Sequence, residues 1–196
     1  MTDLVITARY RANLARGKAG LLALLAALWA RMYDPANPAS VQMIATLAGT
    51  FTVRSQAAAV TQARGYLMAL TTHQPYAIPP GVIGMSASGY TVPALTGLAP
   101  LIWAGRLRAG QGQAAAAGAA QSWLSAIAAS EPYRAANATV HANAASDPRL
   151  TGLVERVTGG GACDFCQSIA DQGYQPASAD FEAHTHCQCT AAPEVA

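Results

Sequence analysis

Charged residues are scarce in this chain of 196 residues: Asp, Glu, Lys and Arg make up 11%, against roughly 25% in soluble domains. Aromatic residues are also few, at 7%, whereas 52% of the residues are hydrophobic. This balance excludes a charged, disordered tail as the whole protein. Much of the apolar content is alanine, as in the run 114–117, which favours helices over a core of large side chains. The composition indicates an assembly component whose surface contacts other proteins.

The chain also lacks an apolar run long enough to cross a membrane. Its most apolar window, 19–30, lies between Lys18 and Arg31 and would reach about 18 Å as a helix, against ~30 Å of hydrocarbon. No A-x-A cleavage site follows before Arg31, so the window does not fit a signal peptide. We therefore expect a buried helix face here and no membrane partner.

Motifs of the common enzyme classes are missing. The sequence has no H-E-x-x-H, no G-x-S-x-G and no G-x-x-x-x-G-K-[ST] phosphate loop. His73 and His141 are isolated, as packing or surface histidines are, and Asn137-Ala-Thr139 matches a glycosylation acceptor that matters only in a secreted protein. We expect no enzymatic activity and no small-molecule substrate.

The spacing of apolar residues predicts a mainly α fold of elongated, alanine-rich helices. One helix is expected over 4–33 and a second over 41–71, with Ser40 as its N-cap. A third helical stretch over 101–129 is expected to be interrupted at Gly110, Gly112 and Gly118, and a shorter helix over 132–145 follows. Residues 74–100, between the second and third helical stretches, contain five prolines and four glycines and are expected to form a linker. Loops of this length are typically functional or ordered by a partner.

These patterns divide the chain into four regions. They are an N-terminal helical region 1–73, a Pro/Gly-rich linker 74–100, an alanine-rich helical region 101–148 and a small C-terminal α+β module 149–196.

The charged residues are distributed unevenly along the chain. Residues 1–110 carry nine cations and two acids, a balance of +7, whereas the remainder carries three cations and eight acids. The basic part indicates a phosphate-rich or acidic partner; solvated helix faces are the alternative.

All four cysteines lie in the last 34 residues, in an ordered pattern with histidine. The pattern C-x2-C-x17-H-x2-C-x-C places a first pair and a second cluster at a spacing typical of zinc sites. It predicts one structural Zn²⁺ ion, with ligands drawn from Cys163, Cys166, His184, Cys187 and Cys189.

Several alternatives stay open at this point. His186 is a sixth candidate for four places, and the sequence does not choose between an all-cysteine shell and three cysteines with a histidine. Two disulfides or a redox C-x2-C are the competing interpretations of the cysteines. A shell of four protein ligands leaves no position for water, so it would be structural, and it would hold a module with few large apolar groups. These groups are Phe165, Ile169, Tyr174 and Phe181.

The segment 156–173, together with the closing cluster 184–193, resembles the C-terminal signature of MuF-type minor head proteins of tailed bacteriophages, most of all those of actinobacterial phages. The matching positions are Cys163, Cys166, Gly173, His184, Cys187, Cys189 and Pro193. His186 stands at a variable position of that signature.

The resemblance implies a virion protein that lies inside the capsid near the portal vertex and aids head assembly, DNA packaging or ejection. Its implied partners are the portal protein, the major capsid protein or both, and packaged DNA through the basic N-terminal part. Before assembly, such a protein resides in the host cytoplasm. The resemblance also implies no enzymatic activity for this region.

Two other functions fit parts of the sequence. A zinc knuckle that binds nucleic acid would carry basic residues, but 163–189 contains four acids and no Lys or Arg, which favours contact with protein. A zinc enzyme would need one ligand position occupied by solvent.

Overall fold

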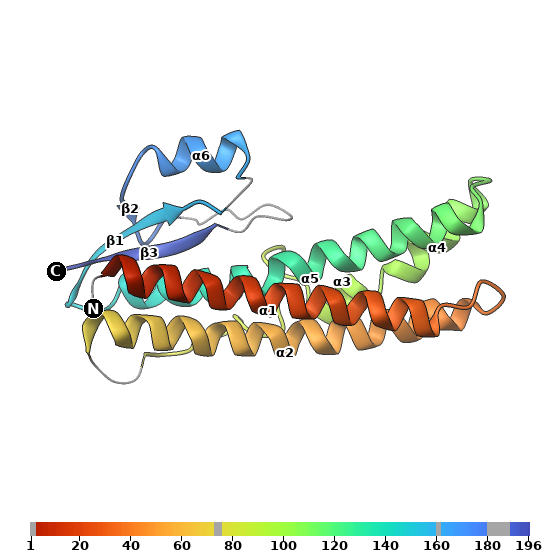
Figure 1. Ribbon diagram of the computed structural model, residues 1–196, viewed down its shortest axis with the longest axis horizontal. Coiled ribbons are helices and arrows are strands. Elements are labelled where there is room, and N and C mark those ends of the chain that lie inside the picture. The colour runs from red at the N-terminus through yellow and green to blue at the C-terminus, as the bar shows by residue number, and fades with distance from the viewer. Residues whose placement is uncertain (1–2, 73–75, 160–161, 180–188) are drawn as a thin grey trace.

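The computed structural model describes residues 3–72, 76–159, 162–179 and 189–196. The chain is mainly helical with one small sheet, which confirms the predicted class (Figure 1). In chain order the elements are α1 (Asp3–Met32), α2 (Pro38–Thr71), α3 (Val92–Thr96), α4 (Ala99–Arg108), α5 (Gln113–Ala144), β1 (Leu150–Val157), α6 (Asp164–Ala170), β2 (Gln175–Pro176) and β3 (Thr190–Val195).

Helices α1 and α2 lie side by side and run along most of the molecule (Figure 1). Both were predicted, but the N-cap of α2 is Asn37 and not Ser40. Because Pro38 already occupies the first helical position, Asn37 Oδ1 accepts a hydrogen bond from the Ala39 N–H at 3.1 Å. Ser40 is buried in the first turn, where its hydroxyl donates to the Asp34 carbonyl oxygen at 3.1 Å.

The apolar window 19–30 forms part of α1 and presents one face to the core. Leu21, Leu25 and Trp29 are buried in a cluster with residues of α2, α4 and α5, which confirms the expected buried face. None of the helices among the described residues has the length and apolarity that a membrane span needs.

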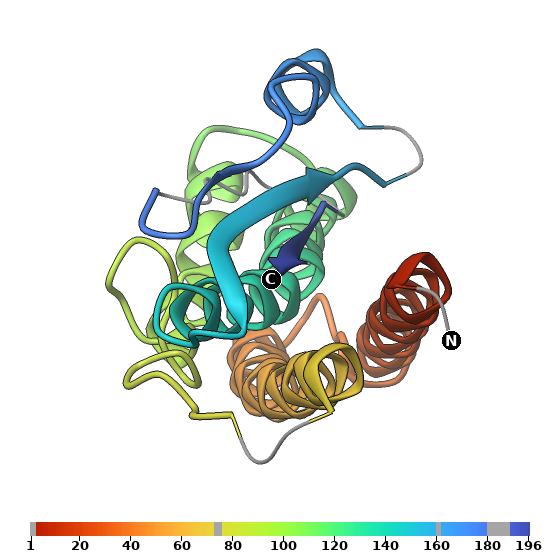
Figure 2. The same ribbon diagram turned by 90° about the vertical axis from the view of Figure 1, so that its left-hand side faces the viewer.

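Helix α5 occupies the centre of the molecule, between the sheet and α2 (Figure 2). The glycines at 110 and 112 separate α4 from α5 as predicted, but the breaks expected at Gly118 and before Pro132 are absent, and α5 continues through both. A helix-interior proline costs roughly 3 kcal/mol. The burial of Glu131, Pro132 and Tyr133 offsets this cost, because packing against neighbouring elements holds the helix together.

The Pro/Gly-rich linker is held against the helices by buried polar side chains. Asn143 of α5 accepts from the Ala77 N–H at 3.1 Å and donates to the Ala77 carbonyl at 3.0 Å. Gln56 of α2 accepts from the Gly84 N–H at 2.8 Å and donates to the Met85 carbonyl at 3.0 Å. The described part of the linker is therefore ordered by this chain itself, and it includes the short helix α3.

The sheet has the strand order β2-β1-β3, and both pairings are antiparallel. In the register of β1 and β3, Val154 lies opposite Pro193 and Leu150 opposite Val195, with an irregularity between them. Gly152 falls at this point with φ of +78°, a backbone conformation that glycine adopts without steric cost. One face of the sheet shares a hydrophobic cluster with α1, α2 and α5, so the helices supply much of its core. The division into four regions stays a prediction.

Gly49→Ala is expected to destabilise the protein by about 1–3 kcal/mol of unfolding free energy, measured by urea denaturation. The added methyl group would lie 2.7 Å from Thr96 Oγ1 and 3.3 Å from Pro93 Cα, so α3 would have to move away from α2. Gly118→Ala in α5 is the matched control, because its methyl group meets nothing within 4 Å. This control should gain up to about 1 kcal/mol from helix propensity. Equal effects of the two substitutions would contradict the close α2–α3 contact.

Candidate metal centre

Three of the five predicted zinc ligands lie among the described residues, and two of these are packed together. Cys163 directly precedes α6 and is exposed, whereas Cys166 lies in the first turn of α6 and is 0% exposed. Cys189, directly before β3, is 1% exposed and shares a small buried cluster with Cys166. The other two predicted ligands, His184 and Cys187, lie outside the described residues, as does His186.

A buried arginine accompanies the Cys166 sulfur. Arg156, near the end of β1, is 5% exposed, and its Nη1 donates toward Cys166 Sγ at 3.7 Å. Hydrogen-bond donors of this kind commonly accompany thiolate ligands and orient them. The β1 strand therefore supplies a positive charge to the side of α6 that carries the buried cysteine.

The backbone next to Cys189 is fixed by one amide side chain of α5. Asn137, 1% exposed, donates from Nδ2 to the Cys189 carbonyl at 3.0 Å, and its Oδ1 accepts from the Ala191 N–H at 3.0 Å. Both bonds are buried, where a hydrogen bond is stronger and its loss costs more than in water. Asn137 thereby sets the position at which β3 begins, and with it the position of Cys189.

At the opposite edge of the sheet, His141 of α5 holds the segment that follows β2. Its Nδ1 lies 3.1 Å from the Ala177 carbonyl oxygen, and burial lowers the pKa of His141 below its usual value of 6.5. The Ala177 N–H donates in turn to the Gly152 carbonyl of β1 at 2.7 Å. Asn137 and His141 are one helical turn apart, so a single face of α5 anchors the outer parts of the sheet.

The donor set fits a thiolate-binding metal such as zinc, which prefers sulfur and imidazole ligands. No disulfide links the three cysteines that the structure describes. Residues 3–72, 76–159, 162–179 and 189–196 contain no cluster of three or more His, Cys, Asp or Glu side chains suited to a metal ion. A zinc site here therefore requires ligands from 184–187 in addition to the buried Cys166–Cys189 pair.

Two of the few large apolar side chains of the module lie largely at its surface. Phe165 and Tyr174 are each 45% exposed and do not pack inside the module. The reason is the position of the sheet: its inner face packs on α5 through Val154 and Ala191, so α6 and the segment after it lie on the outside. Phe181 lies outside the described residues.

Sequence reasoning missed Asn137 and Arg156 as parts of this region. Asn137 was noticed only as a glycosylation acceptor, which its burial now excludes in the folded protein. One feature of the sequence could have identified Asn137: it is a polar residue four positions before His141 in an otherwise alanine-rich helix. A polar group buried in such a helix needs a hydrogen-bond partner.

Residues 102–196 match the VG15 protein family, a family of viral gene proteins, and the match indicates a phage protein. The matched segment covers α5, the sheet and the cysteine cluster. No curated protein and no solved structure matches the chain. The likeness to MuF-type minor head proteins stays a prediction.

Asn137→Ala is expected to lower the free energy of unfolding by about 2–4 kcal/mol, because it leaves a buried carbonyl and a buried N–H without partners. The same variant should show faster amide hydrogen exchange in 189–195, since β3 loses its anchor on α5. Asn13→Ala is the control, because the Asn13 side chain bonds only to an exposed arginine among its recorded contacts. Unchanged exchange in β3 of the Asn137 variant would contradict the anchoring role.

Proposed function

We propose that the protein is a structural component of a phage virion: a minor capsid protein inside the head, near the portal vertex, that aids head assembly. It contacts the portal protein, the major capsid protein or both, and has no enzymatic activity. The observation that carries this proposal is the phage-family match over 102–196, a segment that also contains the cysteine and histidine pattern of MuF-type minor head proteins.

The surface supports a protein that is covered by partners in its working state. Large apolar side chains are exposed on several elements: Leu4 is 83% exposed, and Tyr90 and Leu101 are each 63% exposed. Because only 11% of the residues are charged, the chain has few charged side chains to keep these exposed apolar groups soluble. These side chains are separated along the chain, which fits contact with more than one neighbour in an assembly.

Within this function, one structural Zn²⁺ ion is held by four of Cys163, Cys166, His184, Cys187 and Cys189. The ion would link the start of α6 to the segment before β3, two parts of the chain that share only a small buried cluster. Such a link supplies the stability that the exposed Phe165 and Tyr174 do not. With four protein ligands, no position remains for a reactive water, so the site is structural.

In this proposal, DNA is contacted by the basic N-terminal part of the chain and not by the cysteine module. The described part of the cysteine segment contains Asp164 and Asp171, both exposed, and no Lys or Arg. Arg9, Arg16 and Arg31 of α1 are exposed, in contrast, and α1 carries no acid after Asp3. Packaging or ejection of DNA would therefore involve the α1 surface, and the cysteine module would face protein.

The purified, reduced protein is expected to contain about one zinc per chain, with thiols that react with a thiol reagent only after chelation. Elemental analysis and thiol titration measure both. Cys163→Ser and Cys166→Ser should each lower the zinc content and expose the C-terminal module to protease, whereas His141→Gln, outside the ligand set, should keep the zinc. Metal-free protein with four reactive thiols, or a protease-resistant module in the Cys163 variant, would overturn the zinc assignment.

Phage particles are expected to contain the protein in few copies, in a protected location. Quantitative mass spectrometry of purified heads measures the copy number, and protease treatment of intact and opened heads measures protection. We expect digestion only after opening, together with chemical cross-links to the portal protein. Particles that lack the protein, or digestion in intact heads, would refute the location.

A further inference from the structure

A groove of about 480 Å³ lies between the start of α1 and strand β3, at the end of the molecule that carries the sheet (Figure 1). Its lining includes apolar side chains of both elements, and two of these, Leu4 and Val195, are exposed. Exposed apolar side chains gathered at a hollow surface are typical of contact sites. The groove volume is within the range of roughly 300–1,000 Å³ that is usual for binding pockets, which gives room for one or two side chains of a partner.

The groove has a negative charge that the chain itself does not neutralise. It is lined by the acids Asp3, Glu155 and Glu194. None of these carboxylates forms an ion pair with the part of the chain that the structure describes. The lining has one cation, Arg11, whose guanidinium binds the Thr158 carbonyl oxygen. The groove therefore favours a partner that brings a cation together with apolar side chains.

The three carboxylates act on the same part of the groove. Burial raises the pKa of Tyr174, another lining residue, and the charges of the three carboxylates raise it further. Glu194 is also fixed in place, since its Oε2 accepts a hydrogen bond from Thr151 Oγ1 at 2.7 Å. A guanidinium in the groove would thus meet several carboxylate oxygens, the acceptors that it binds best.

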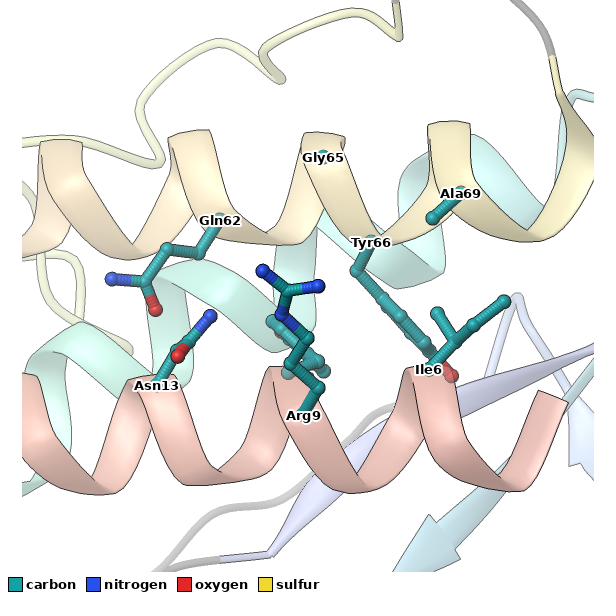
Figure 3. A pocket seen from close by; sticks show the side chains of 8 residues that line it. Ile6, Arg9, Asn13, Gln62, Gly65, Tyr66 and Ala69 are labelled. Atoms are coloured by element: carbon teal, nitrogen blue, oxygen red, sulfur yellow. The ribbon is translucent and has the colours of Figure 1, made fainter. Parts of the chain in front are cut away.

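A neighbouring cavity, between α1 and α2, has the opposite charge. It measures about 310 Å³, shares the Tyr66 side chain with the groove, and is lined by Arg9 but by no acid (Figure 3). The cation of a partner would be repelled there by the Arg9 guanidinium. Of these two hollows, charge therefore selects the groove beside the sheet.

A surface that matches the groove lies on α4 of this same chain. One side of the helix carries, at steps of three and four residues, Leu98, Leu101, Gly105 and Arg108. Both leucines and Arg108 are exposed, and a Cβ at Gly105 would meet no atom within 4 Å. Trp103, on the other side of α4, is buried among the helices. This α4 face thus combines an apolar surface with a cation and is open to solvent.

The groove and the α4 face cannot meet within one molecule. The groove lies at the sheet end, whereas α4 lies at the opposite end, where a short turn joins it to α5 (Figure 1). The sequence also separates the charges, because 35–130 contains no acid and 157–196 contains no Lys or Arg. The charge at each end is therefore left for another molecule to neutralise.

From these observations we infer that the protein binds a second copy of itself head to tail, with the α4 face of one copy in the groove of the next. Arg108 pairs with the groove carboxylates, while Leu98 and Leu101 cover the apolar lining around Leu4. Because the two surfaces differ, each copy uses both at once, and the contact repeats along a ring or a filament. The inference goes beyond the proposed function and depends neither on the virion nor on zinc.

Sedimentation equilibrium of the purified full chain tests this inference. The average mass is expected to rise with protein concentration above that of one chain, and to fall when salt is added, since salt screens the paired charges. Arg108→Glu and Glu155→Arg should each weaken the association at least about tenfold, because like charges then face each other. Arg31→Glu and Asp171→Arg make the same charge changes at exposed positions outside both surfaces and should leave the association unchanged.

An equimolar mixture of the Arg108→Glu and Glu155→Arg proteins separates binding from folding. The reversed α4 face of one variant meets the reversed groove of the other, and the two unchanged surfaces still match. The mixture should therefore associate at least about tenfold more strongly than either variant alone. Misfolded variants would not recover in this way.

Four results would overturn the inference. The first is a chain that stays monomeric at every concentration in low salt. The second is association that neither charge reversal weakens, which would place the contact elsewhere on the surface. The third is the lack of recovery in the mixture. The fourth is a monomeric chain whose groove residues shift in NMR spectra when an arginine- and leucine-rich peptide is added, since the occupant would then be a different protein.

Discussion

The burial of α5 is the constraint on which the rest of the structure depends. This helix lies between α2 and the sheet, yet its buried residues include Glu131, Asn137, His141 and Asn143. Each polar side chain in such a place needs a partner, or the fold loses about 1–3 kcal/mol per group. The partners come from segments with little packing of their own: the linker and the two outer parts of the sheet. The polar residues of α5 therefore decide where these segments lie.

Glu131 shows how far such a group depends on its neighbours. Burial raises the pKa of Glu131, while the Arg134 guanidinium at 2.8 Å and the Gln56 amide at 3.2 Å oppose this shift. Arg134 also donates to the Met85 carbonyl, as Gln56 does. One buried carboxylate thus joins α5, α2 and the linker through shared donors. The arrangement gives the linker a defined path without a regular secondary structure of its own.

Much of the helical fold could be predicted from the sequence, because apolar spacing and glycine breaks act locally. The extents of α1 and α2 and the break at 110–112 follow from such signals. Pro132 was misinterpreted because its cost is local while the packing that offsets it comes from distant elements. The linker was misjudged for the same reason, since Gln56 and Asn143 lie 28 and 66 residues from the groups they bind.

In the cysteine region, the spacing of cysteine and histidine predicted which residues are candidate zinc ligands, but not which side chains surround them. Nothing in a C-x2-C pair distinguishes the exposed Cys163 from the fully buried Cys166, since that difference arises from where α6 meets the sheet. Arg156 carries no recognisable pattern, and it becomes relevant only because β1 runs beneath α6. The exposure of Phe165 and Tyr174 could not be predicted from composition either, because it depends on α5 covering the inner face of the sheet.

The connectivity of the chain makes some of these contacts entropically costlier to close than others. Five residues join α1 to α2 and four join α4 to α5, so both helix pairs close over short loops. The sheet closes over long ones: Val154 pairs with Pro193, and Arg11 of α1 binds the Thr158 carbonyl across 147 residues. Closing a longer loop costs more chain entropy, so the sheet contacts carry a larger entropic cost than the helix pairs. The burial of the Cys166 and Cys189 sulfurs depends on these costlier contacts.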